Sequence, residues 1–184
     1  MAQTEGGELL YGFPPIIGER PRVLILGSMP SVKSLELGQY YGHPRNHFWD
    51  IVFRILAEPV PRDYEQRVRE LKRAGIAVWD AIGSCRREGS LDQSIKDEVP
   101  NDVVGLLRKF SGIRLVVFNG RKAEQGFYRG LKELYGYHAR ERVPELNSRD
   151  FIRLPSSSPI PTRQHKRWQD KLAEWRIILK YLQD

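Results

Sequence analysis

The chain has 184 residues, enough for one domain with a hydrophobic core of its own. Its only cysteine, Cys85, excludes an internal disulfide, a four-thiolate iron–sulfur cluster and a cysteine-rich zinc site. Thirty basic against 23 acidic residues give a formal charge of +7, which favours polyanionic partners. We find no basic start followed by an apolar run and no membrane-length apolar stretch, so we expect a cytoplasmic protein without membrane contact.

The expected elements alternate between strands and helices. A continuous apolar run over 23–26 predicts a strand covered on both faces, and Gly27 ends it. Apolar residues at helical spacing predict a helix over 46–56. The next expected elements are a helix over 63–74, a strand over 76–80, a helix from Asn101 or Asp102 to Phe110, a strand over 115–118, a helix to about Tyr135 and a strand over 151–154.

Three remaining segments are predicted from their composition. Residues 81–100 are rich in Gly, Ser, Arg and Asp with little periodicity, which predicts a loop, and residues 136–150 are polar. Thr162 is expected to begin the final helix, because apolar residues follow it in one stripe. That stripe consists of Trp168, Leu172, Trp175, Ile178, Leu179 and Leu182.

These elements predict an α/β fold, a three-layer α/β/α sandwich with a central, mostly parallel four-stranded sheet. We expect a single domain over 1–184, with residues 1–20 as an N-terminal extension that packs on it. Ligands of such sheets bind beyond the carboxyl ends of the strands. Four strand exits therefore meet at one edge: 27–30, Asp80, Asn119-Gly120 and 155–160.

One segment near this edge combines an aromatic side chain with an amide. Tyr41 is held in a loop by Gly-His-Pro, and Asn46 lies at the start of the next predicted helix. Together with backbone donors of the turn after the first strand, these groups suit a planar, polar ligand such as a nucleobase.

Three segments resemble motifs of the uracil-DNA glycosylase superfamily. Gly27-Ser28-Met29-Pro30-Ser31 resembles its first active-site motif, and residues 41–49 are similar to the aromatic-plus-Asn helix start of its mismatch-specific branch. Residues 154–160 resemble the final motif, where a Ser/Pro turn carries an apolar residue into DNA. The order Tyr-Tyr, then Pro-Arg-Asn-x-Phe-Trp, looks most like the hypoxanthine-DNA (deoxyinosine) glycosylase branch.

Two positions depart from other branches of that family. Met29 stands where they carry a polar Asn, Asp or Glu that helps to activate water, so the resemblance implies that Asn46 is the catalytic residue. Ser156 stands where branches that excise uracil place His or Asn, so efficient release of uracil is not expected.

The resemblance implies a monofunctional DNA glycosylase that hydrolyses the N-glycosidic bond of a flipped, deaminated base in base excision repair. The base is expected to be hypoxanthine, the partner DNA that contains it, and the protein a monomer without cofactor or metal. No lysine stands out as a Schiff-base nucleophile, so lyase activity is not expected. Asn46 would hold the water, while Asp80 would be the base or would read the edge of the nucleobase.

The other expected site residues fall into two groups. The base-binding group is Tyr41, Gly27, Ser28, Met29, Asp80 and Phe48, and the DNA-binding group is Ser156, Ser157, Ser158, Ile160 and Arg163. Tyr41 would stack on the base, and Ile160 would fill the gap left in the duplex. Taken without the resemblance, the serines read as a helix-capping turn, Phe48 as core and Asn119-Gly120 as a tight strand exit.

Three alternatives stay open. One is a uracil or G/U-G/T mismatch-specific DNA glycosylase. A second is a non-catalytic nucleic-acid binding module, which would not depend on Asn46. A nucleotide-handling enzyme ranks third, because the turn over 27–30 lacks the glycine-rich phosphate-binding patterns.

Overall fold

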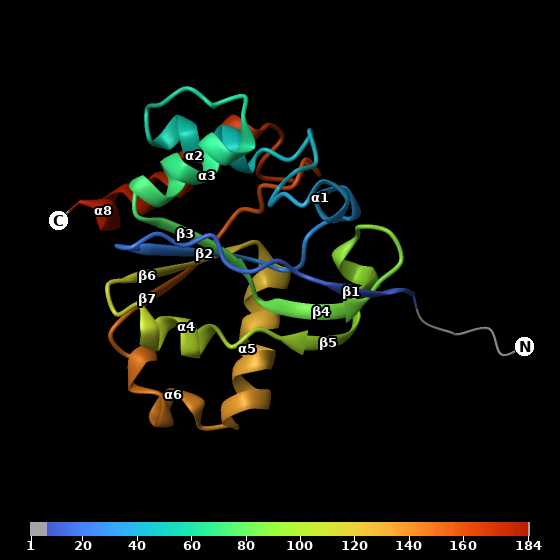
Figure 1. The fold of residues 1–184 in the computed structure, drawn as a ribbon, viewed down its shortest axis with the longest axis vertical. Helices are drawn as coiled ribbons and strands as arrows, with labels where there is room; N and C mark the ends of the chain where they lie inside the picture. Colours follow the sequence, from blue (N-terminus) through green and yellow to red (C-terminus); the bar gives the residue numbers. More distant parts are fainter. Residues whose placement is uncertain (1–6, 184) are drawn as a thin grey trace, which may run out of the picture.

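The computed structural model describes residues 7–183 and contains two sheets (Figure 1). The larger sheet has four parallel strands in the order β3-β2-β6-β7, so the predicted sheet is confirmed. Its strands are β2 (Val23–Gly27), β3 (Ile76–Asp80), β6 (Leu115–Asn119) and β7 (Asp150–Leu154).

Both faces of this sheet are covered, as its apolar strands require. Val23 and Ile25 of β2 belong to one core cluster, whereas Leu24 and Leu26 belong to the other, because successive side chains of a strand point to opposite faces. The covering helices are α2 (Phe48–Ile55), α3 (Tyr64–Arg73), α7 (Leu172–Trp175) and α8 (Leu179–Leu182) on one face, and α4 (Val103–Lys109), α5 (Arg121–Tyr135) and α6 (Ala139–Arg142) on the other. Figure 1 shows these two helical layers above and below the sheet.

A second, antiparallel sheet corrects the prediction of a loop over 81–100. It has the order β1-β4-β5, with β1 (Leu9–Tyr11), β4 (Ile82–Arg86) and β5 (Lys96–Pro100). These strands cannot be predicted from the sequence pattern, because β5 is largely polar and the register of the β4–β5 pair shifts on both sides of Ser84. A short 3₁₀ turn, η1 (Asp92–Ser94), lies in their connection.

The described part of the N-terminal extension packs against both sheets. Its strand β1 pairs with β4, and Ile16 forms an antiparallel bridge with Val78 of the larger sheet. The carbonyl oxygen of Phe13 accepts hydrogen bonds from Tyr40 Oη and Trp79 Nε1, each 3.1 Å long. Residues 1–6 of the expected extension lie outside the described residues.

Two helix starts differ from the predictions. The first is α2, which begins at Phe48 and not at Asn46, whose carboxamide oxygen accepts the Phe48 N–H at 3.0 Å. The final helix does not begin at Thr162, since a 3₁₀ turn, η3 (Trp168–Lys171), is the first helical segment after β7. The Asp170 carboxylate accepts the N–H groups of residues 166 and 167 and thereby sets this later start.

Three short elements complete the chain. Helix α1 (Val32–Leu37) was not expected from the sequence; the hydroxyl of Ser31 caps it by accepting the Ser34 N–H at 3.1 Å. The other two are the 3₁₀ turns η2 (Pro144–Leu146) and η4 (Arg176–Ile178). Within residues 7–183 no helix has both the length and the apolar character needed to cross a bilayer.

Candidate active site

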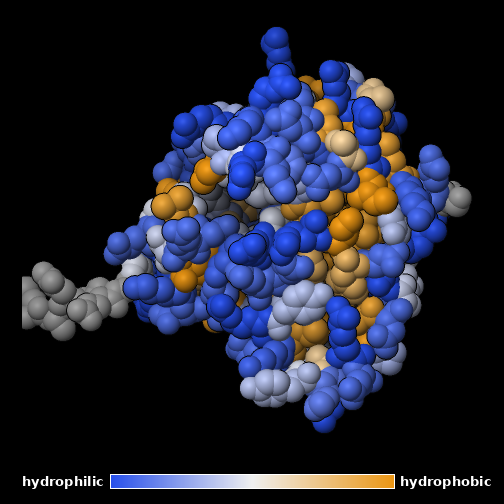
Figure 2. Space-filling view, turned by 180° about the vertical axis from the view of Figure 1, so that it is seen from behind, coloured by the Kyte–Doolittle hydropathy of each residue, from blue (hydrophilic) through white to orange (hydrophobic). Residues whose placement is uncertain are grey.

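The four strand exits lie together at one edge of the parallel sheet. In the register of the sheet, Gly27 at the end of β2 is paired with Asp80 at the end of β3, and Asn119 of β6 is paired with Leu154 of β7. The segments that follow these strands form the walls of the candidate site. Figure 2 shows a hollow in the molecular surface between mostly hydrophilic side chains.

The carboxamide of Asn46 is fixed through its oxygen. Oδ1 accepts the Phe48 N–H and also the hydroxyl of Ser157, at 2.9 Å, whereas no described residue bonds to Nδ2. Both lone pairs of the oxygen are therefore occupied in the free protein. The water-accepting role expected of Asn46 requires the Ser157 hydroxyl to turn away.

Asn119 connects this amide to the aromatic ring of the site. Its Oδ1 accepts the Ser157 N–H at 2.8 Å, and its Nδ2 donates to the Ser157 hydroxyl at 2.9 Å and to the Tyr41 hydroxyl at 3.1 Å. The sequence interpretation of Asn119 as only a tight strand exit missed this role. The available signal was an amide at a strand end, the same position in the fold that singled out Asp80.

Tyr41 lies on Phe48. The two rings stack with centroids 3.8 Å apart and planes inclined by 14°. Phe48 is fully buried and also meets Trp49 and Trp175 edge-on, so it supports Tyr41 from behind and does not face the site, contrary to the base-binding role expected for it. Tyr41 has a φ of +53°, which is rare for a bulky residue and marks backbone strain of the kind often stored at functional sites.

Gly27 makes room for the two groups opposite it. A Cβ atom there would collide with Oδ1 of Asp80 and would lie 3.1 Å from the hydroxyl oxygen of Tyr41. The glycine expected at this motif is therefore required by close packing of an acid and a phenol against the backbone.

Asp80 is a buried acid with an unused oxygen. Its side chain is nearly inaccessible, and Oδ2 has no hydrogen-bond partner among the described residues. Burial, and secondly the charge of Asp92, raise the pKa of Asp80 to about 7, while the Arg87 guanidinium acts in the opposite direction. Asp80 therefore changes charge near neutral pH.

The turn after β2 is held by the β4–β5 connection. Ser28 Oγ donates to Asp92 Oδ1 at 2.7 Å, and a buried Arg87 donates to the carbonyl oxygen of Pro30. The side chain of Met29 packs into a small apolar cluster and does not line the site by its thioether. Asp92 was missed by sequence reasoning because it lies in the segment 81–100, which was interpreted as a loop.

The serine turn, residues 156–158 after β7, lies partly in the site and partly at the surface. Ser157 is buried and uses its hydroxyl and both backbone groups inside the protein, so it does not lie on a surface that DNA phosphates could reach. Ser156 Oγ accepts the Ser158 N–H at 3.2 Å, so these serines cap their own turn. No helix follows directly, so the interpretation of these serines as a helix-capping turn is wrong.

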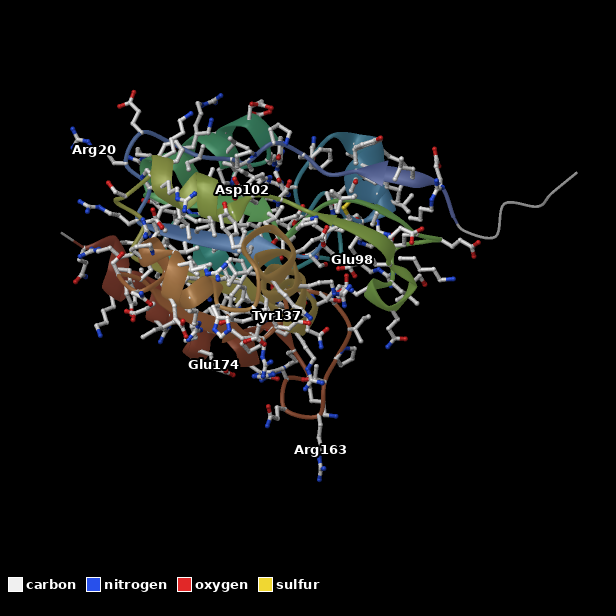
Figure 3. The ribbon with its side chains drawn as sticks, turned by 90° about the horizontal axis from the view of Figure 1, so that it is seen from below. Arg20, Glu98, Asp102, Tyr137, Arg163 and Glu174 are labelled. Atoms are coloured by element: carbon white, nitrogen blue, oxygen red, sulfur yellow. The ribbon has the colours of Figure 1, made fainter. Side chains whose placement is uncertain are left out.

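The two remaining expected DNA contacts are exposed. Ile160 is 60% accessible although it is apolar. Figure 3 shows Arg163 at the tip of the same loop, pointing away from the body of the protein. Within the described residues, no group of three or more His, Cys, Asp or Glu side chains is placed to hold a metal ion.

Comparison with known proteins identifies the family of this chain. Residues 14–183 match the family model of the uracil DNA glycosylase superfamily. A hypoxanthine DNA glycosylase of Methanosarcina acetivorans is 37% identical over 171 residues, which cover 92% of this chain and 98% of that protein. A hypoxanthine DNA glycosylase of Methanosarcina barkeri is 40% identical over 130 residues, covering 70% of this chain and 81% of that one.

A solved structure is also similar to this chain. The solution NMR structure of a Methanosarcina acetivorans protein, described as a candidate uracil DNA glycosylase, superposes with a TM-score of 0.74 at 33% identity. The match covers 95% of this chain and 99% of the other. The chain therefore belongs to the uracil DNA glycosylase superfamily.

Proposed function

We propose that this protein is a monofunctional DNA glycosylase that hydrolyses the bond between deoxyribose and a flipped deaminated base, with hypoxanthine as the preferred base. The observation that carries the proposal is the hydrogen-bonded chain Asn119–Ser157–Asn46 beside the Tyr41 ring, at the sheet edge where this fold binds ligands. The two relatives named hypoxanthine DNA glycosylase support the choice of base.

Tyr41 supplies the stacking surface for the everted base. One face of its ring lies on Phe48, which leaves the other for a ligand. The Asn119 hydrogen bond to its hydroxyl fixes the plane of the ring. Stacking of a base on such a ring contributes about 1–3 kcal/mol, which helps to offset the few kcal/mol lost when the base leaves the duplex.

Asp80 reads the edge of the base. Hypoxanthine presents an N1–H donor, which the unpartnered Oδ2 can accept, whereas adenine presents a lone pair at N1. The anionic acid therefore favours hypoxanthine and repels adenine. Because its pKa is about 7, this discrimination develops as the pH rises through neutrality.

Asn46 positions the hydrolytic water. When a water enters, the Ser157 hydroxyl turns away, and one lone pair of Asn46 Oδ1 can then accept a hydrogen bond from the water. The amide does not take the proton as a base would; it aligns the water with the anomeric carbon while positive charge develops on the sugar. Asp80 remains the second candidate for the proton acceptor.

The exposed end of the serine turn acts on the duplex. Ile160, which is 60% exposed, fills the space of the extruded base, while Arg163, Ser156 and Ser158 contact the DNA backbone. The formal charge of +7 supports binding to this polyanion. A monomer that works in the cytoplasm remains our expectation from the sequence.

The test is base release from defined duplexes. Purified protein is incubated with DNA containing inosine, uracil, xanthine or mispaired thymine, and free base is measured by chromatography, with Asn46→Ala as the control. We expect fastest release from inosine and a loss with Asn46→Ala. Preferential release of uracil or thymine would favour the mismatch-specific alternative; binding without release of any base would favour a non-catalytic module.

A further inference from the structure

A buried lysine lies beneath the serine turn. Lys171, the last residue of η3, is only 4% exposed. Its ammonium group donates to the carbonyl oxygen of Ser156 at 2.6 Å and to that of Ser158 at 3.0 Å. These two contacts fix the turn on either side of Ser157.

This lysine carries its charge without an acidic partner. Within the part of the chain that the structure describes, no carboxylate lies in ion-pair distance of Lys171. Burial lowers the pKa of Lys171, as expected for a desolvated ammonium group. A methionine of similar length would avoid this cost of desolvation, so the two hydrogen bonds are what distinguish lysine at this position.

The neighbouring residues of the turn are held as well. Trp175 Nε1 donates to the carbonyl oxygen of Pro155 at 2.9 Å, and the His47 N–H donates to that of Ser157 at 3.0 Å. Beyond Ser158, the exposed Ile160 has only a 3.4 Å hydrogen bond from its N–H to the Ser158 hydroxyl. Lys171 is therefore the last group of the protein body that holds the turn before its exposed tip.

We propose that Lys171 is a positioning residue that fixes the turn so that Ile160 can enter a duplex, and that it thereby governs base-pair opening and not hydrolysis. This inference rests on the proposed glycosylase function. Pocket contacts through Asn119 and His47 hold Ser157 independently, so loss of Lys171 leaves the catalytic amide in place. The tip of the turn, in contrast, loses two charge-assisted hydrogen bonds.

The experiment compares substrates that differ only in the cost of opening. Single-turnover release of hypoxanthine is measured from inosine paired with cytosine and from inosine opposite an abasic site. With Lys171→Met we expect a loss of about 10- to 100-fold on the paired substrate and of less than about threefold on the unpaired one. Ile160→Ala should show the same substrate dependence, whereas Asn46→Ala should lose activity on both substrates.

Two controls separate positioning from general damage. Lys171→Arg keeps a charged donor and should recover part of the activity on the paired substrate. Trp175→Phe removes the N–H that holds Pro155 together with part of a buried ring that packs edge-on against Phe48, and should give a smaller loss with the same substrate dependence once thermal melting has shown that the variant is folded. This variant decides the matter if Lys171→Met unfolds. Equal losses on both substrates would overturn the proposal.

A second readout does not need base release. The fluorescence of 2-aminopurine placed beside inosine rises when the stack opens, and Lys171→Met should abolish most of this rise while DNA is bound. An unchanged rise would contradict the role of Lys171. Absence of hypoxanthine release by the wild-type protein from either substrate would instead contradict the glycosylase proposal, so the two failures are distinguishable.

Discussion

The two sides of the candidate site differ in how fully their polar groups are paired. On the β6–β7 side, Asn119 and Ser157 use their side chains in mutual hydrogen bonds that also hold Asn46. On the β3–β4 side, buried polar atoms of Asp80 and Arg87 have no partner among the described residues. Unpaired buried groups cost free energy in the absence of a ligand. We therefore propose that the first side maintains the geometry of the site and that the second binds the ligand.

The paired side should be the more sensitive to truncation. Ser157→Ala frees one lone pair of Asn46 Oδ1 for water but leaves this amide held by the Phe48 N–H alone, and it leaves the half-buried amide of Asn119 with one partner fewer. We expect a loss of about 1–3 kcal/mol in stability and a fall of about 10- to 100-fold in the single-turnover rate. Thermal melting and rate measurement check both, and an unchanged rate would show that the chain of hydrogen bonds does not position the amide.

Tyr41 spans the two sides, and its ring and hydroxyl can be tested separately. Tyr41→Ala removes the stacking surface and should weaken binding of the flipped base by about 5- to 100-fold. Tyr41→Phe keeps the ring and loses only the hydrogen bond from Asn119, so its loss should be several times smaller. Equal losses in affinity for an inosine duplex would assign the effect to the hydroxyl and not to stacking.

On the unpaired side, a change of pH should change the activity more than truncation of a side chain does. If the Asp80 anion accepts N1–H, kcat/KM for inosine should rise with pH and level off above about 7, and Asp80→Asn should lack this rise. The same acid costs stability as the pH rises from about 4 toward 7, because its folded pKa exceeds the unfolded one. Thermal melting of Asp80→Asn should not show that loss of stability as the pH rises. If both proteins have the same dependence of kcat/KM on pH, Asp80 is excluded as the origin of that dependence.

Substitution of Arg87 should have the smallest effect on activity. Its charge lowers the pKa of Asp80, so Arg87→Met should raise that pKa and move the activity profile to more alkaline pH. The buried guanidinium also holds the carbonyl oxygen of Pro30, and Arg87→Lys serves as a control that keeps the charge. A shift of the profile toward acid pH would contradict this account of the pocket.

The sequence predicted those parts of the fold that depend on local apolar patterns. Continuous apolar runs such as 23–26 and 115–118 indicate strands buried on both faces, and their order places Asp80 and Asn46 near one sheet edge. The antiparallel sheet was not predictable in this way, since β5 is polar and its pairing depends on the distant β4.

The site was predictable in composition but not in its contacts. Asn119 and Ser157 act through each other, 38 positions apart, and Phe48 supports the tyrosine that was expected beside it. Asp92 reaches Ser28 only because the β4–β5 connection folds over the turn after β2. Such roles depend on tertiary contacts, which composition and periodicity do not contain.

We propose that the Asn46 amide serves the hydrolytic step and not DNA binding. The most direct test of this proposal measures, for the wild type and Asn46→Ala, both the affinity for an inosine duplex and the single-turnover rate of base release. We predict that the rate falls by about 100- to 1000-fold while the affinity changes by less than about threefold. A variant that releases hypoxanthine at the wild-type rate, or that loses affinity and rate in equal proportion, would contradict it.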